Sequence, residues 1–155
     1  MDHAFEAFYR VAADSMVKGM AIAIASETAE YDRREWAVRV RGHQVMLTPD
    51  RVILTGDGTV HVQRIRTGRE TESESGKPIY ALLRRGAEAQ YPGKRIVVET
   101  FYLATGKRVA VAPDQDEDSL DKYAEAIAAI EDGNFEPSPS ARTCPKCQCY
   151  FICRG

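Results

Sequence analysis

The sequence predicts a mixed α/β domain of 155 residues. Apolar residues recur at steps of three and four from about residue 2 to residue 28, which is the period of an amphipathic helix. After Tyr31 the period changes to two, as in strands that are buried on one face. A second helical pattern, two further strand patterns and a third helical pattern follow along the chain. This order of elements is that of a mixed α/β fold.

In the first half of the chain we expect one helix and a meander of three antiparallel strands. The helix is expected to face the core with the apolar stripe Phe5, Phe8, Ala12, Met16, Met20 and Ala23. The three strands are expected at about 36–40, 45–54 and 60–67. Gly42-His43 and Asp57-Gly58 mark the turns between them.

In the second half, a polar loop at 70–77 leads into a helix from Ile79 to about residue 91. Strands are predicted at 95–103 and 107–111, on either side of Thr105-Gly106. The acidic residues at 114–118 favour the start of a third helix, because negative charge stabilises a helix N-terminus. We expect Gly133 to end this helix, and its buried side to be Leu120, Tyr123, Ile127 and Ile130.

Composition and charge exclude several classes of protein. The chain is 44% hydrophobic and 28% charged, which is typical of globular domains rather than disordered ones. The longest apolar stretch, 20–25, is far shorter than the roughly 20 residues of a membrane span, and no basic leader begins the chain. We therefore expect a cytoplasmic protein with no membrane partner. A net charge of −2 leaves nucleic-acid binding to a local patch.

All four cysteines lie near the end of the chain, after the segment Pro137-Ser-Pro139. They are Cys144, Cys147, Cys149 and Cys153. Disulfides that stabilise a fold usually close long loops, whereas thiolates two residues apart suit zinc or an iron-sulfur cluster. We therefore predict a domain at 1–136 and a cysteine knuckle at 137–155 that binds metal, with free thiols as the alternative.

Several short motifs resemble those of one enzyme superfamily. They are Asp50-Arg51-Val52, the segment 56–60, Thr67-Gly68-Arg69, and the segment 135–139 that leads to the cysteines. In this order the motifs resemble the PD-(D/E)XK nuclease superfamily, and most closely its RecB and AddB branch. The resemblance implies a restriction-endonuclease-like mixed sheet flanked by helices. It also implies DNA as a partner, a UvrD-like helicase in the same polypeptide or complex, and a role in recombination or repair.

The resemblance also implies a metal site, from which this sequence departs. The superfamily uses two acids to hold Mg²⁺ and a nearby lysine to activate water. Asp50 matches the first acid, but the usual Asp-Tyr-Lys-Thr-Gly is replaced by Arg64-Ile65-Arg66-Thr67-Gly68. Because a guanidinium does not deprotonate in proteins, we expect a catalytically degenerate domain. Asp50 is then an inactive remnant that pairs with Arg64 or Arg66 across the strands.

Three functions follow as expectations. In the first, the domain binds DNA phosphates without cutting them, through Arg51, Arg64, Arg66 and Arg69. In the second, it is an active exonuclease that uses Mg²⁺, with Asp57 or Glu99 in place of the missing acid. In the third, it is a protein-interaction scaffold, and the arginines are ordinary solvated side chains.

For the cysteines, the resemblance implies a 4Fe-4S cluster. Cys144, Cys147 and Cys153 match three of its ligands, and the fourth cysteine of that branch, far upstream, has no counterpart here. Cys149 is an addition that completes a four-thiolate set; alternatively, the chain begins after the upstream cysteine. Zinc held by all four thiolates is the other expected centre.

Overall fold

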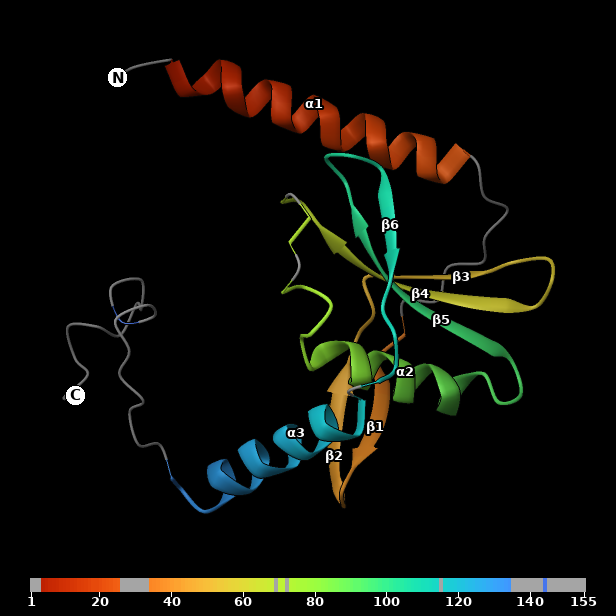
Figure 1. Ribbon diagram of the computed structural model, residues 1–155, viewed down its shortest axis with the longest axis vertical. Helices are drawn as coiled ribbons and strands as arrows, with labels where there is room; N and C mark the ends of the chain where they lie inside the picture. The colour runs from red at the N-terminus through yellow and green to blue at the C-terminus, as the bar shows by residue number, and fades with distance from the viewer. Residues whose placement is uncertain are drawn as a thin grey trace.

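The computed structural model describes residues 4–25, 34–68, 70–71, 73–114, 116–134 and 144 (Figure 1). The helices are α1 (Ala4–Ala25), α2 (Ile79–Gln90) and α3 (Asp116–Glu131). The strands are β1 (Trp36–Val40), β2 (His43–Leu47), β3 (Arg51–Leu54), β4 (Thr59–Arg66), β5 (Arg95–Tyr102) and β6 (Lys107–Ala110). Among the described helices, none combines the length and apolar character needed to cross a membrane.

The strands form two sheets. Strands β1 and β2 pair as an antiparallel hairpin, and the other four form one sheet in the order β3-β4-β5-β6. Within this sheet β4 and β5 are parallel, while the outer pairs are antiparallel. Parallel neighbours need a crossover connection, and α2 supplies it between β4 and β5. The predicted mixed α/β fold with flanking helices is confirmed.

The predicted three-stranded meander is wrong, because its middle strand is two strands. The stretch expected at 45–54 is divided between β2 and β3, and Pro49 lies in the break. Proline has no backbone N–H to donate to a sheet ladder, so it interrupts strand pairing. As a result β2 pairs only with β1, and β3 begins the larger sheet beside β4.

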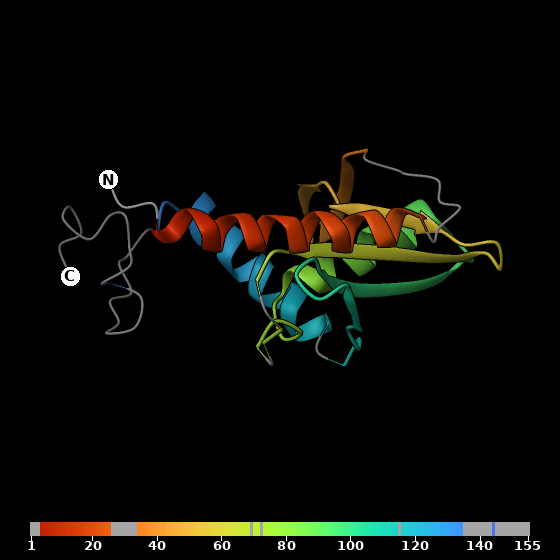
Figure 2. The same cartoon turned by 90° about the horizontal axis from the view of Figure 1, so that it is seen from above.

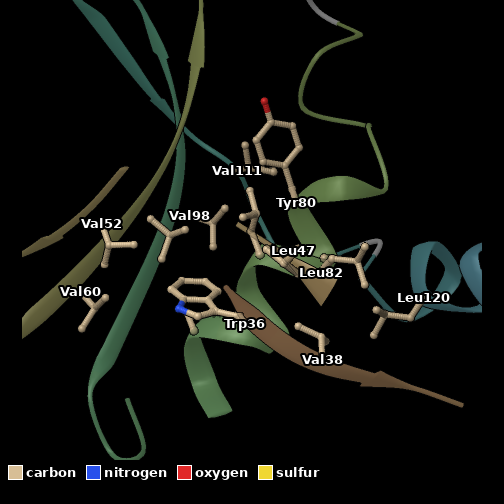
Figure 3. Packing of buried hydrophobic residues seen from close by; sticks show 14 of the residues in the cluster. Trp36, Val38, Leu47, Val52, Val60, Tyr80, Leu82, Val98, Val111 and Leu120 are labelled. Carbon is tan, nitrogen blue, oxygen red and sulfur yellow. The ribbon is translucent and has the colours of Figure 1, made fainter. Parts of the chain in front are cut away.

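The main core lies where α2 meets the four-stranded sheet, the β1–β2 hairpin and α3 (Figure 3). The sheet contributes Val52, Val60, Val62 and Val98, each at most 2% exposed. Trp36 of the hairpin packs so closely on α2 that a Cβ at Gly86 would lie 2.7 Å from the indole Cε3. This glycine therefore allows the hairpin and α2 to approach each other.

Helix α1 lies outside the main core, although Ala12, Met16 and Met20 of its apolar stripe are partly buried. It lies across the β5–β6 turn, at one end of the sheet (Figures 1 and 2). A Cβ at Gly19 would overlap the carbonyl of Leu103 in that turn, so the contact is close at this point. None of the α1 side chains that the structure describes is buried, and Val11 is 70% exposed. The stripe indicated a helix correctly, but a periodic pattern does not say what the helix packs against.

Helix α3 follows the sequence prediction except at its C-terminal end. Leu120 is buried, and Gly133, with a φ of 70°, comes directly after the last turn as expected. Ile130 is 58% exposed rather than buried. Only the N-terminal part of α3 packs closely on the core.

Candidate functional site

Asp50 lies directly before β3, next to the end of β4. The register pairs Arg51 with Gln63, so the next position along the two strands places Asp50 beside Arg64. Asp50 Oδ2 accepts a hydrogen bond of 2.8 Å from the backbone N–H of Ile65. In the described part of the chain, Asp50 forms no ion pair with either arginine. The predicted cross-strand pairing is therefore replaced by a backbone hydrogen bond.

Arg64 and Arg66 share one face of β4, because successive strand residues alternate between faces. This is the face of Val62, on the side of α2. The guanidinium of Arg64 lies over the Tyr80 ring, with its Cζ 5.7 Å from the ring centroid. Arg64, Arg66 and Asp50 line a pocket of about 300 Å³. The pocket is also lined by Leu47, Thr48, Ile65, Ile79 and Leu83.

The counter-charge for both arginines comes from Glu74, in the loop between β4 and α2. Its carboxylate is 4% exposed, with Oε1 3.8 Å from Arg64 Nε and Oε2 3.5 Å from Arg66 Nε. Lys77 Nζ donates a hydrogen bond of 2.5 Å to Oε2, and the Tyr80 hydroxyl donates one of 2.9 Å to Oε1. One buried anion therefore faces three cations.

The surroundings of Glu74 and Tyr80 fix their protonation states. Burial favours a higher pKa for Glu74, but hydrogen bonds from Lys77 and Tyr80 and the charge of Arg66 lower the pKa below its usual 4.5. Burial and the hydrogen bond to Glu74 raise the pKa of Tyr80 to about 12, against the effect of Thr100, whose Oγ1 lies 2.7 Å from the phenol oxygen. Figure 3 shows this hydroxyl pointing away from Trp36 and Leu82. At neutral pH Glu74 is ionised and Tyr80 is protonated.

The PD-(D/E)XK nuclease superfamily has a family model that matches residues 2–154. The chain belongs to this superfamily. No curated protein and no solved structure matches it. The match spans Asp50, the arginine-bearing end of β4 and the cysteine run, so it confirms the superfamily that the short motifs predicted.

The sequence interpretation aligned Arg64 and Arg66 with the second acid and the lysine of the superfamily motif. If the alignment of the sequence with the motif is shifted by one residue, Gln63 takes the position of the second acid. The structure places Gln63 on the other face of the sheet, where its amide bonds to Arg51 and Glu99. The strand alternation therefore supports the alignment that puts an arginine beside Asp50.

The opposite face of the sheet carries a buried polar row across three strands. Arg51 donates a hydrogen bond of 3.2 Å from Nη1 to Gln63 Oε1, and Gln63 Nε2 donates one of 2.5 Å to Glu99 Oε1. Arg51 is 1% exposed and Gln63 is fully buried. A phosphate cannot reach a guanidinium at this depth. Arg51 therefore does not belong to a DNA-binding surface, contrary to the expectation from its motif.

The two acids considered as replacement metal ligands do not lie beside Asp50. Asp57 occupies the β3–β4 turn, at the other end of the hairpin, where its carboxylate accepts hydrogen bonds from Thr55 and Thr59. These bonds lower the pKa of Asp57 to about 2. Glu99 lies on the opposite sheet face with Gln63, and its Oε1 is 3.6 Å from His61 Nδ1. Each acid therefore has a structural role away from the pocket.

Several predicted site residues lie outside the described residues. They are Arg69, Cys147, Cys149 and Cys153. Cys144 is described and is partly exposed. Among the residues that the structure describes, no three His, Cys, Asp or Glu side chains gather as metal ligands would.

The sequence interpretation missed Glu74, which holds the site together. An available signal was the series Glu70, Glu72 and Glu74, directly after a strand that ends in arginines. Opposite charge predicts that one of them pairs with the strand. It does not say which one, because the loop has no periodicity that selects a buried position.

Proposed function

We propose that this chain is the nuclease-like domain of a DNA helicase-nuclease of recombination or repair, of the RecB and AddB type, and that it binds DNA without cleaving it. The observation that carries the proposal is Arg64 beside Asp50. The resemblance implies that the second metal ligand stands at this position. A divalent cation about 4 Å from a guanidinium is repelled by on the order of 8 kcal/mol at an effective dielectric constant of about 20. Arg66 adds to this repulsion. The single carboxylate of Asp50 does not offset the repulsion of a cation by both guanidiniums.

The same arginines support DNA binding, because phosphate contacts need positioned cations and no metal. The side chains of Arg64 and Arg66 are 24% and 39% exposed, so both remain accessible from the pocket. Arg69 continues this basic segment in the sequence and stays part of the proposal. Binding of this kind is independent of Mg²⁺ and weakens steeply with salt.

A titration of fluorescent single-stranded DNA, followed by anisotropy, tests this proposal. We expect the same affinity in EDTA and in Mg²⁺, and a linear fall of the logarithm of affinity with the logarithm of salt concentration. An affinity that requires Mg²⁺ and disappears in Asp50→Ala would instead indicate a working metal site. No binding under either condition would favour the scaffold function.

We also propose that Cys144, Cys147, Cys149 and Cys153 bind one metal centre, either zinc or a 4Fe-4S cluster, that fastens residues 137–155. The support is the donor set itself, four thiols within ten residues, since thiolates are the preferred ligands of both centres. A small metal site of this kind contributes directly to folding.

Metal analysis and visible absorption after anaerobic purification distinguish the two centres. A brown protein that contains iron indicates the cluster, and a colourless protein with stoichiometric metal indicates zinc. We expect Cys147→Ser to melt at a lower temperature than the metal-loaded parent. Equal melting of the two proteins, with no metal in either, contradicts the proposed centre.

A further inference from the structure

The pocket beside Asp50 combines an apolar wall with a cationic rim. Partly exposed Ile79, with the nearly buried Leu47 and Leu83 beneath it, forms the wall, and Arg64 and Arg66 form the rim. At about 300 Å³ the pocket is at the lower end of the size range of small-molecule sites, which are mostly apolar with a few positioned polar groups. An apolar wall next to paired guanidiniums suits a ligand with a flat base and a phosphate.

The two arginines of the rim pair with Glu74 on the side away from the pocket. In each one, Nε is the nitrogen that lies near Glu74, and Glu74 does not line the pocket. In the described part of the chain, the terminal nitrogens of Arg64 and Arg66 donate no hydrogen bond to another residue. The planar guanidinium presents several donors in a fixed geometry that matches a phosphate. These donors are available to a ligand in the pocket.

We propose that this pocket binds one unstacked nucleotide of single-stranded DNA, with its phosphate on Arg64 and Arg66 and its base against Ile79. The inference rests on the proposed DNA binding and gives it a substrate class. A nucleotide within a duplex is paired and stacked, so its base cannot enter a side pocket without leaving the helix. Single strands offer both the base face and the backbone, which are the two groups that such sites use.

Glu74 is a positioning residue in this site. Its carboxylate is fixed by Lys77 and Tyr80, and it restricts both guanidiniums without occupying the pocket. An arginine that is already restricted to one rotamer loses less conformational entropy when the ligand binds. It therefore binds the ligand more tightly than a mobile arginine does.

Anisotropy titrations with two DNA probes test the proposal. One probe is a single-stranded oligonucleotide, and the other is a closed dumbbell duplex without strand ends. We expect Arg64→Gln and Arg66→Gln each to weaken single-strand binding by about tenfold, the effect of losing a charge-assisted hydrogen bond, and to change dumbbell binding far less. Arg95→Gln is the matched control, because Arg95 pairs with Thr59, five residues before Arg64 and thus roughly 17 Å away.

Competition and a second variant separate a nucleotide site from a bare anion site. Deoxythymidine monophosphate is expected to displace the single strand at lower concentration than inorganic phosphate does. We expect Glu74→Gln to weaken single-strand binding while dumbbell binding persists, whereas a folding defect would reduce both. Exposed Glu70 provides the control Glu70→Gln, which is expected to bind like the parent.

The outcomes distinguish this inference from the function on which it rests. If single-stranded DNA binds and the Arg64, Arg66 and Arg95 variants all lose affinity equally, the pocket is not the site, although DNA binding stands. Equal competition by inorganic phosphate overturns the nucleotide assignment. If the parent binds neither probe, both the inference and the proposed DNA binding are wrong.

Discussion

The charges beside Asp50 are reversed relative to those of a metal site, since Arg64 and Arg66 supply cations and Glu74 supplies the buried anion. The positions of Asp50 and the arginines were predictable, because motif spacing fixes them along the strands. The role of Glu74 was not, because the burial of this carboxylate depends on how the loop folds over Tyr80. The predicted cross-strand ion pair of Asp50 was wrong because Glu74, from the loop, pairs with both arginines instead.

Glu74→Gln tests the importance of this buried anion for stability. We expect the free energy of unfolding at pH 7 to fall by about 1.5–3 kcal/mol, the usual contribution of hydrogen bonds to a charged group. The control Glu70→Gln removes an exposed pair with Lys107, so its effect should be about 0–1 kcal/mol. Urea unfolding of the three proteins provides the measurement, and equal losses in the two variants would contradict the account.

The pH dependence of that effect has a defined sign. The pKa of Glu74 is lower in the folded protein than its usual 4.5, so its carboxylate stabilises the fold fully above about pH 4.5. That contribution is lost as the pH falls through the lower folded-state pKa. The difference between the parent and Glu74→Gln should therefore shrink on acidification.

At the scale of elements, periodicity predicted what the residues form but not always what they pack against. Strands β4 to β6 and helices α2 and α3 lie close to their predicted ranges, because each shows a clear period bounded by turn residues. The break between β2 and β3 had a visible signal in Pro49. The position of α1 outside the main core had none, because an amphipathic stripe is the same whether its partner is the core or another surface.

Gly86→Ala tests the packing between α2 and the β1–β2 hairpin. Alanine favours a helix over glycine by about 1 kcal/mol, but here its Cβ would lie 2.7 Å from Trp36 Cε3 and 3.1 Å from Val38 Cγ2. We expect the clash to exceed the gain, with a net loss of about 1–3 kcal/mol in urea unfolding. Gly56→Ala, which meets nothing within 4 Å, is the control. A variant at Gly86 as stable as the parent would show that Trp36 can move without cost.

At the scale of the whole molecule, the two faces of the four-stranded sheet have separate roles. One face packs on α2 and ends in the pocket beside Asp50, and the other carries the buried row Arg51, Gln63 and Glu99. Because of this division, Glu99 lies on the opposite face from Asp50. Along the paired strands β3, β4 and β5, Asp50 is the one acid on the face of the pocket. The sequence placed Asp50 and the arginines on neighbouring strands, but the two-faced arrangement requires the register of β3, β4 and β5.

We propose above all that this PD-(D/E)XK domain holds DNA without cleaving it. The most direct measurement incubates the purified protein with linear single-stranded and double-stranded DNA, in Mg²⁺ and in Mn²⁺, and follows the release of nucleotides. We expect intact DNA under all four conditions, because the charges of Arg64 and Arg66 would repel a metal from Asp50. Metal-dependent release of nucleotides that disappears in Asp50→Ala would contradict the proposal.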